Sequence, residues 1–335
     1  MGRFVAFGEV MLRLSPPNRE QLLQSPKLDV WIGGAESNVA TQLARLGHDV
    51  AMATALPDNA LGDAAVAFLR GHGIDTRGIL RRGTRVGLYF ATVGAGLRPS
   101  DVLYDRAGSA FATTPVEAWD WDAMLAGADR LHLSGITPAL GPGGSAAAVA
   151  AVEAAARADV PVSFDGNYRA RLWEAWDSDP RAVLTTLVAH ADLLFGNHRD
   201  ISLLLGRYFG GGGADRRREA ADAAFAHFPK LQLIASTARH ADDADRNRLS
   251  ARIDARHEAV QTDEVLITGI VDRIGGGDAF AAGVLHGLRT GLSLQAAAET
   301  GLAVSALKHS LPGDAALFRQ GDIDAFLAGG FDVRR

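Results

Sequence analysis

Short hydrophobic runs recur along the chain, and each ends in small or polar residues before a stretch with helical spacing. The runs cover residues 3–7, 130–133, 160–164, 192–195 and 231–234. In the stretches between them, apolar residues return every three or four positions, as in Val39, Leu43 and Leu46 before Gly47. This repeated order of strand-like run and helix-like stretch predicts an α/β fold with a mostly parallel sheet.

Two segments do not follow this alternation. Residues 10–33 and 86–112 are strand-like and lack a long helical pattern, so we expect them to form a small separate β layer. Four glycines at 210–213 precede a charged stretch at 215–219, which predicts the exposed first turns of a surface helix. The chain has no internal repeat and no long linker, and we expect one domain over residues 1–335.

Composition and charge favour a small-molecule partner. Of the 335 residues, 47% are hydrophobic and 22% are charged, which is typical of a globular protein with a full core. The 34 Lys and Arg residues against 39 Asp and Glu residues give a formal charge of −5. Because no polybasic block is present, the sequence gives no electrostatic support for binding to nucleic acid or to a membrane surface.

The chain contains no cysteine, which excludes disulfides, thiolate zinc sites and cysteine nucleophiles and fits a reducing cytoplasm. Charged residues at Arg3, Glu9 and Arg13 interrupt the apolar start, unlike a signal peptide. No window of about 20 residues is apolar enough to span a bilayer. We therefore expect a cytoplasmic protein. Its 38 glycines are well above the roughly 7% that is typical of proteins.

Four polar clusters follow predicted strands. They lie at residues 133–135, 164–169, 195–200 and 235–237. In open α/β sheets, ligands bind beyond the carboxyl ends of the strands. Turn chemistry explains any one cluster, because Asp, Asn, Ser and Gly are common where a strand hands over to a helix. Four clusters at one edge favour a ligand cleft.

The sharpest local motif is a run of three glycines, Gly275, Gly276 and Gly277, followed by Asp278 and an apolar helical stretch. Glycines allow backbone amides to converge, and a helix N-terminus adds positive charge, so the motif predicts an anion site. Asp278 beside it is suited to accept the proton of a hydroxyl that attacks a phosphoryl group. The alternative is that Asp278 only caps its helix, and spacing alone does not separate the two.

Three further residues are candidates for ligand contacts. Asn38 follows the pair Gly33-Gly34 at a predicted helix start, where its amide can donate to and accept from sugar hydroxyls, although it is equally incidental if a neighbour caps the helix. Arg106 and Arg169 lie in segments already singled out. If both point into the cleft, their guanidinium groups suit a carboxylate or a phosphate.

These motifs resemble the ribokinase-like (PfkB) carbohydrate kinases over nearly the whole chain. The matching residues, in the order of that family, are Gly33, Gly34 and Asn38, then Asp165, Asn167 and Arg169, then Asn197 and Asp200, then Gly275 to Asp278. Within the family, the sequence is most similar to 2-keto-3-deoxygluconate kinases. The motifs that carry this are 34–38, 104–106, 164–169 and 311–314.

The resemblance implies a three-layer α/β sandwich with a small β-sheet lid formed by approximately 10–33 and 86–112. Lids of this kind often pair, so it implies a homodimer or a higher homo-oligomer. It also implies ATP and Mg²⁺ as cofactors and leaves open a monovalent cation such as K⁺. The expected reaction is transfer of the γ-phosphoryl group of ATP to a primary hydroxyl of 2-keto-3-deoxygluconate.

The same resemblance assigns roles to individual residues. Asp278 is the expected base, and the amides of Gly275, Gly276 and Gly277 form the anion hole. The expected substrate contacts are Gly34, Asn38, Tyr89, Arg106 and Arg169. The expected nucleotide contacts are Asn167, Asn197, Ser236 and Thr237. Asp200 is expected to act on magnesium indirectly, through water.

Three departures from the family pattern keep alternatives open. Gly276 replaces a usual alanine, Asp200 replaces a usual glutamate, and residues 235–243 lack the glycines of a loop that borders the nucleotide in many relatives. One alternative is a kinase of a neutral ketose, ribose or nucleoside, from which Arg106 and Arg169 would distinguish the sugar-acid enzyme. The other is a sugar-binding regulator that has lost phosphoryl transfer.

Overall fold

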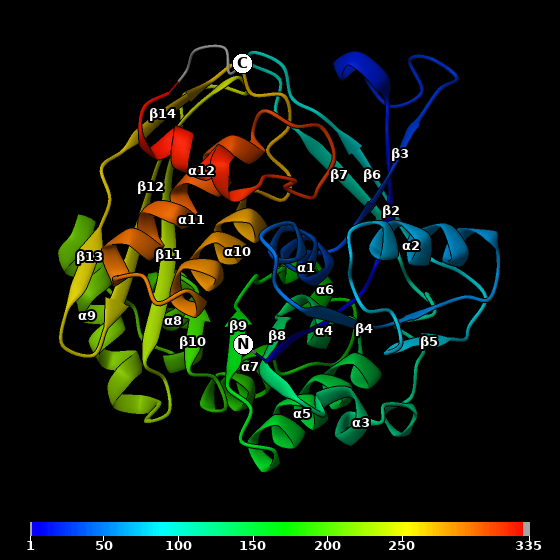
Figure 1. Cartoon of the computed structure of the whole chain (residues 1–335), viewed down its shortest axis with the longest axis horizontal. Helices are drawn as coiled ribbons and strands as arrows, with labels where there is room; N and C mark the ends of the chain where they lie inside the picture. The colour runs from blue at the N-terminus through cyan, green and yellow to red at the C-terminus, as the bar shows by residue number, and fades with distance from the viewer. Residues whose placement is uncertain (1, 331–335) are drawn as a thin grey trace.

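A computed structural model describes residues 2–330 and contains one large and one small β-sheet (Figure 1). The large sheet has the order β13-β12-β11-β10-β9-β8-β1-β4-β5, with β14 paired to β12. Neighbours from β11 to β5 are parallel, whereas β12, β13 and β14 pair antiparallel. The predicted mostly parallel sheet is confirmed. The strands are β1 (Arg3–Phe7), β4 (Val50–Leu56), β5 (Ile79–Arg81), β8 (Ala128–Ser134), β9 (Val162–Asp165), β10 (Leu193–Phe195), β11 (Leu233–Ala241), β12 (Arg246–Ala255), β13 (Ala259–Gln261) and β14 (Val265–Thr268).

Helices cover both faces of this sheet, because its inner strands are apolar on both sides. In β1, Phe4 and Ala6 belong to one core and Val5 and Phe7 to the other, as the two-residue period of a strand requires. The first core is closed by α1 (Ala35–Arg45), α2 (Ala60–Gly71), α10 (Gly276–Arg289) and α11 (Leu294–Lys308), with α12 (Gln320–Leu327) against α11. The second is closed by α3 (Trp121–Leu125), α5 (Pro142–Arg157), α7 (Pro180–Ala189), α8 (His198–Leu205) and α9 (Gly213–His227). Two short helices, α4 (Ile136–Ala139) and α6 (Ala170–Trp173), follow β8 and β9.

The segments predicted as a separate β layer form the small sheet. It contains β2 (Met11–Ser15), β3 (Asp29–Gly33), β6 (Gly87–Thr92) and β7 (Asp101–Asp105), in the order β3-β2-β6-β7. In Figure 1 it stands at the upper right, beside the large sheet. The glycine-rich run also behaves as predicted, since α9 begins at Gly213 and its first turn is exposed.

One predicted strand end is wrong. We expected residues 235–237 to follow a strand, but β11 continues to Ala241. Its parallel partner β10 stops at Phe195, opposite Ala235, and the antiparallel strand β12 supplies hydrogen-bond partners for the rest of β11. Ser236 and Thr237 therefore lie inside a strand that extends past its parallel neighbour.

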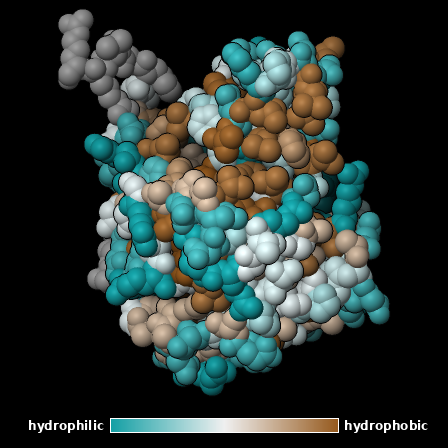
Figure 2. All heavy atoms as spheres, turned by 90° about the vertical axis from the view of Figure 1, so that its right-hand side faces the viewer, coloured by the Kyte–Doolittle hydropathy of each residue, from teal (hydrophilic) through white to brown (hydrophobic). Residues whose placement is uncertain are grey.

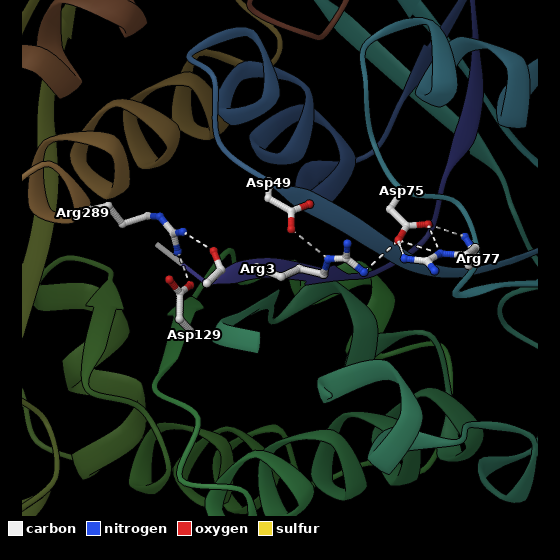
Figure 3. A network of polar contacts seen from close by, with 7 residues as sticks. Arg3, Asp49, Asp75, Arg77, Asp129 and Arg289 are labelled. Carbon is white, nitrogen blue, oxygen red and sulfur yellow. Dashed lines mark hydrogen bonds and ion pairs between the residues drawn. The ribbon is translucent and has the colours of Figure 1, made fainter. Parts of the chain in front are cut away.

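The amino ends of the central strands are joined by ion pairs (Figure 3). Arg3 Nε lies 3.2 Å from Asp49 Oδ2, and Arg3 Nη1 lies 2.8 Å from Asp75 Oδ2, which also binds Arg77. Nearby, Arg289 forms an ion pair with Asp129. The Arg77 hydrogen bond lowers the pKa of Asp75. Within residues 2–330, no helix combines the length and apolar character needed to cross a membrane.

Candidate active site

A cavity of about 580 Å³ lies between the small sheet and the carboxyl ends of the large sheet. It brings together ten of the residues predicted from the sequence, from five separate parts of the chain. They are Gly34, Asn38, Tyr89, Arg106, Asn167, Arg169, Gly275, Gly276, Gly277 and Asp278. Four predicted residues do not line it: Asn197, Asp200, Ser236 and Thr237.

The glycine loop forms the start of α10. Gly275 has φ +82°, and a Cβ at this position would overlap the backbone carbonyl oxygen of Asp314, so glycine is required there for two reasons. The N–H of Gly276 donates to Arg273 O at 3.3 Å, which closes a turn before the helix. The positive end of the α10 dipole faces the cavity at this point, where it favours an anion.

Asp278 is the ionisable group next to this loop. Burial raises its pKa to about 7, and the charges of Asp314 and Glu36 act in the same direction. Asn38 opposes the rise by donating from Nδ2 to Asp278 Oδ2 at 2.7 Å. This contact fixes the orientation of the carboxylate, so Asn38 touches the predicted base directly.

Two further carboxylates near Asp278, one buried and one half-buried, have no role assigned from the sequence. Glu36 Oε1 accepts the N–H of Ser134 at 2.9 Å, and burial raises the pKa of Glu36. Burial, followed by the charge of Asp278, raises the pKa of Asp165 to about 8. A Cβ on Gly8 would overlap the Glu36 carboxylate, which indicates how closely the first strand end approaches it. The sequence signals that could have pointed to these two residues are the position of Asp165 at a strand end and that of Glu36 at a helix start.

The side chains expected to contact the sugar acid differ in whether a partner within the protein already occupies their polar groups. Arg106 is buried and donates from Nε to Glu9 Oε2 at 2.8 Å. The hydroxyl of Tyr89 donates to the Asp314 carboxylate. Arg169 is exposed and donates to the backbone oxygen of Tyr168 at 3.2 Å, and no ion pair joins it to a residue in the described part of the chain.

Asn197 and Asp200 form a capping box at α8. Asn197 Oδ1 accepts the N–H of Arg199 at 2.8 Å, and Asp200 Oδ2 accepts the N–H of Asn197 at 2.7 Å. Asn167 lines the cavity with φ +36°, and its N–H donates to Asp165 Oδ1 at 3.1 Å. The nucleotide and magnesium roles of these residues stay predictions.

A second cavity of about 710 Å³ lies among β14, α11 and α12. Apolar side chains such as Val265, Leu302 and Phe326 line it together with His309. His309 also borders the glycine loop, because a Cβ on Gly276 would lie 3.4 Å from His309 Cε1. Sequence reasoning missed this cavity because it did not predict the strands between residues 246 and 268.

Solved structures identify the architecture as the ribokinase-like α/β fold. The crystal structure of 2-dehydro-3-deoxygluconokinase from Thermotoga maritima superposes with a TM-score of 0.92 and 38% identity, covering 98% of this chain and 99% of that chain. A putative ribokinase II from E. coli, in complex with ATP and Mg²⁺, is only 18% identical and shares the fold with a TM-score of 0.81, covering 98% and 100%.

Sequence comparison then gives the family. The sequence model of the family described as "pfkB family carbohydrate kinase" matches residues 1–318, and the chain belongs to this family. A 2-dehydro-3-deoxygalactonokinase from Haloferax volcanii is 34% identical over 327 residues, which are 97% of this chain and 96% of the relative. A 2-dehydro-3-deoxygluconokinase from Bacillus subtilis is 29% identical over 315 residues, covering 92% and 90%. The predicted family and fold are confirmed, and the protein is a carbohydrate kinase.

Proposed function

We propose that this kinase transfers the γ-phosphoryl group of ATP to a primary hydroxyl of a 2-keto-3-deoxy sugar acid, with 2-keto-3-deoxygluconate as the substrate. The observation that carries the proposal is Asp278, whose carboxylate borders the cavity beside the glycine loop and has a pKa of about 7. Such a group is substantially ionised at neutral pH and still basic enough to take a proton. The names of the relatives support the sugar-acid class.

In the proposed reaction, the substrate hydroxyl oxygen bonds to the γ-phosphorus while the bond to the bridging oxygen of ADP breaks. Asp278 accepts the hydroxyl proton late, because in a loose transition state the bond to the attacking oxygen is little formed and its proton is not yet acidic. The helix N-terminus and the amides around Gly275 and Gly277 stabilise charge on the transferred group. Closure of the small sheet over the cavity would exclude water and prevent hydrolysis of ATP.

Asp200 fits an indirect contact with magnesium. Its carboxylate is half-buried, the N–H of Asn197 orients one oxygen, and Gly166 leaves room beside the other. A carboxylate held in this way can accept a hydrogen bond from magnesium-bound water. Bound Mg²⁺ would neutralise phosphate charge during transfer.

We further propose that the cavity beside α11 holds the adenine ring. Its apolar lining suits a flat aromatic base, and His309 connects it to the glycine loop. Ser310 lines this cavity and is exposed, so a larger side chain at this position has space to extend across the cavity. Ser310→Trp should raise the KM for ATP and leave the KM for the sugar unchanged. If wild type and Ser310→Trp have equal KM values for ATP, the adenine ring binds elsewhere.

One observation favours the alternative of a neutral sugar. The Arg106 charge is already balanced by Glu9, so it offers less to a substrate carboxylate than the sequence suggested. Arg169 and Arg273 also line the cavity, and no ion pair joins either of them to a carboxylate among the described residues. Arg273 is held by the backbone oxygens of Asp243 and Ala244, whereas Arg169 donates to the backbone oxygen of its neighbour. The choice between an acid and a neutral sugar therefore depends mainly on Arg169.

An ADP-release assay tests both candidates. The panel contains 2-keto-3-deoxygluconate, its galactonate epimer, fructose, ribose and a nucleoside. We expect turnover on the sugar acids, and Arg169→Ala should raise their KM by about tenfold or more because it removes a charge-assisted contact. Preference for a neutral sugar with unchanged KM in the variant would support the alternative. No turnover on any compound would favour a sugar-binding regulator.

We also propose that the chain forms a homodimer through the small sheet. Val30, Leu14, Phe90 and Leu103 are aligned across its four strands, and the two outermost are 59% and 58% exposed. Figure 2 views the molecule from the right-hand side of Figure 1, where the small sheet lies, and shows apolar side chains gathered in the upper part of this face. Large exposed apolar patches mark interaction sites.

Light scattering after gel filtration tests the dimer. Leu103→Glu should yield a monomer, whereas Leu97→Glu, in the loop between β6 and β7, should not change the mass. A monomeric wild type would contradict the proposal.

A further inference from the structure

Four charged side chains are buried together behind the glycine loop. Arg13, Asp272, Lys308 and Asp314 are 0–4% exposed. Arg13 Nη1 lies 2.6 Å from Asp272 Oδ2 and 2.9 Å from Asp314 Oδ1. Two cations and two anions balance each other here, which matters because an uncompensated buried charge is strongly destabilising.

This group holds the glycine loop in place. Asp272 Oδ1 accepts the N–H of Ile274 at 3.0 Å, and Asp272 Oδ2 accepts the N–H of Gly313 at 3.2 Å. Gly275 in turn lies directly against the carbonyl oxygen of Asp314. The loop whose amides face the cavity is therefore fixed on one side by Asp272 and on the other by Asp314.

Lys308 contributes the second positive charge. It is the last residue of α11 and is 0% exposed, and its Nζ donates to Leu311 O at 3.1 Å. Burial lowers the pKa of Lys308, while the charges of Asp272 and Asp314 raise it and favour the ammonium form. Without this ammonium, two carboxylates would face only Arg13, leaving a net negative charge behind the site of an anionic phosphoryl group.

Buried carboxylates and a backbone carbonyl form an oxygen-rich environment of the kind that attracts a monovalent cation. In this chain the Lys308 ammonium is buried in the same group, where it donates to Leu311 O and is acted on by the charges of Asp272 and Asp314, although no ion pair among the described residues joins it to either carboxylate. We infer that Lys308 is a positioning residue that replaces a bound monovalent cation, so that phosphoryl transfer by this protein does not require K⁺. This inference rests on the proposed kinase activity of the cavity.

A purely structural role for Lys308 is the competing explanation, since cations at a helix C-terminus stabilise the helix. The two roles differ in what a diffusible cation can restore. If the charge positions the glycine loop, a small cation that enters the space left by the side chain should restore kcat. If Lys308 only caps α11, it should not.

The experiment measures kcat of the full chain in KCl, NH₄Cl and choline chloride at a constant ionic strength of about 0.1 M. Wild type should give kcat values within about twofold of each other in the three salts. Lys308→Ala should lose about tenfold or more in choline and recover at least about fivefold in K⁺ or NH₄⁺. Lys308→Met, which fills the space with an apolar chain, should lose kcat without recovery.

Several outcomes would overturn the inference. They are a wild type that needs K⁺, a Lys308→Ala variant with unchanged kcat, or a folded variant that no cation restores. Thermal melts cover the case in which Lys308→Ala is too unstable to assay, because its Tm should rise in K⁺ relative to choline while that of wild type does not. The melts need no substrate, so they decide the cation question even if the protein phosphorylates none of the sugars tested.

Discussion

The two edges of the large sheet use the same residue types in opposite ways. At the amino edge, Arg3, Asp49, Asp75 and Arg77 alternate in charge, and the Arg77 contact holds the pKa of Asp75 below its usual range (Figure 3). At the carboxyl edge, no ion pair joins Asp278 to a cation among the described residues, and burial raises its pKa to about 7. An aspartate with an ion-pair partner has a lowered pKa and stabilises the fold. One that is removed from water without such a partner has a raised pKa and is suited to act as a base.

The largest expected effect separates the two edges by activity. Asp278→Asn should lower kcat by about 10³-fold with little change in the KM for the sugar, because a general base contributes typically 10²–10⁴ to the rate. Asp75→Asn is the matched control and should keep kcat within about twofold. ADP-release kinetics on both variants check this. A nearly normal kcat in Asp278→Asn would remove Asp278 from the base role.

The next effect concerns stability against pH. The pKa of Asp278 is about 7 in the folded state and about 3.9 in an unfolded chain, so the folded state holds a proton over this interval that the unfolded state has lost. Its contribution to the free energy of unfolding therefore decreases as pH rises from 4 to 7. Asp278→Asn removes that loss, and we expect it to be more stable than wild type by on the order of 2 kcal/mol at pH 8.

Urea unfolding at pH 5 and pH 8 measures this difference. The stability gain of Asp278→Asn should be larger at pH 8 than at pH 5. A gain that is the same at both pH values would mean that Asp278 titrates normally in the folded protein.

Asn38 gives a smaller and more specific test. Its amide donates to the charged form of Asp278, so its removal should raise the pKa of that carboxyl further. In wild type, kcat/KM should rise with pH around 7, as the base loses its proton. In Asn38→Ala this rise should move upward by about 0.5–1 in pH. An unchanged pH profile would show that another group titrates in it.

The smallest effect lies at the amino edge. Asp75→Asn should lower the free energy of unfolding by about 0.5–1 kcal/mol at neutral pH, as expected for a partly exposed ion pair. Because the pKa of Asp75 is lowered on folding, its contribution is present above about pH 4 and disappears as pH falls through the folded-state value. Melts at pH 7 and pH 3 should show a larger difference between wild type and variant at pH 7 than at pH 3.

The sequence predicts what local pattern controls. Parallel strands with helix-like connections are periodic, and the cluster around Gly275 and Asp278 combines residues close together in the chain, so both were recognisable. The strands after residue 245 were not, because their antiparallel pairing follows from the extension of β11 rather than from alternation with helices. The cavity among β14, α11 and α12 depends on these strands and was missed with them.

Side-chain partners were also beyond local pattern. Arg106 lines the cavity, as a residue that contacts substrate would, but its guanidinium also binds Glu9, which is 97 residues away along the chain. Tyr89 similarly binds Asp314 across 225 residues. Such pairings are decided by how the small sheet packs on the large one, and a sequence motif gives the residue type without its partner.

The glycine contacts at the carboxyl edge also set which positions are free to change over evolutionary time. At Gly8 and Gly275, any side chain would displace a carboxylate or a backbone carbonyl of the site, so a mutational scan should find almost no tolerated replacement. At Gly212, in the run before α9, a Cβ meets open space, and most replacements should be neutral. Glycine content alone therefore does not measure constraint in this chain, because constraint follows from what lies opposite each missing Cβ.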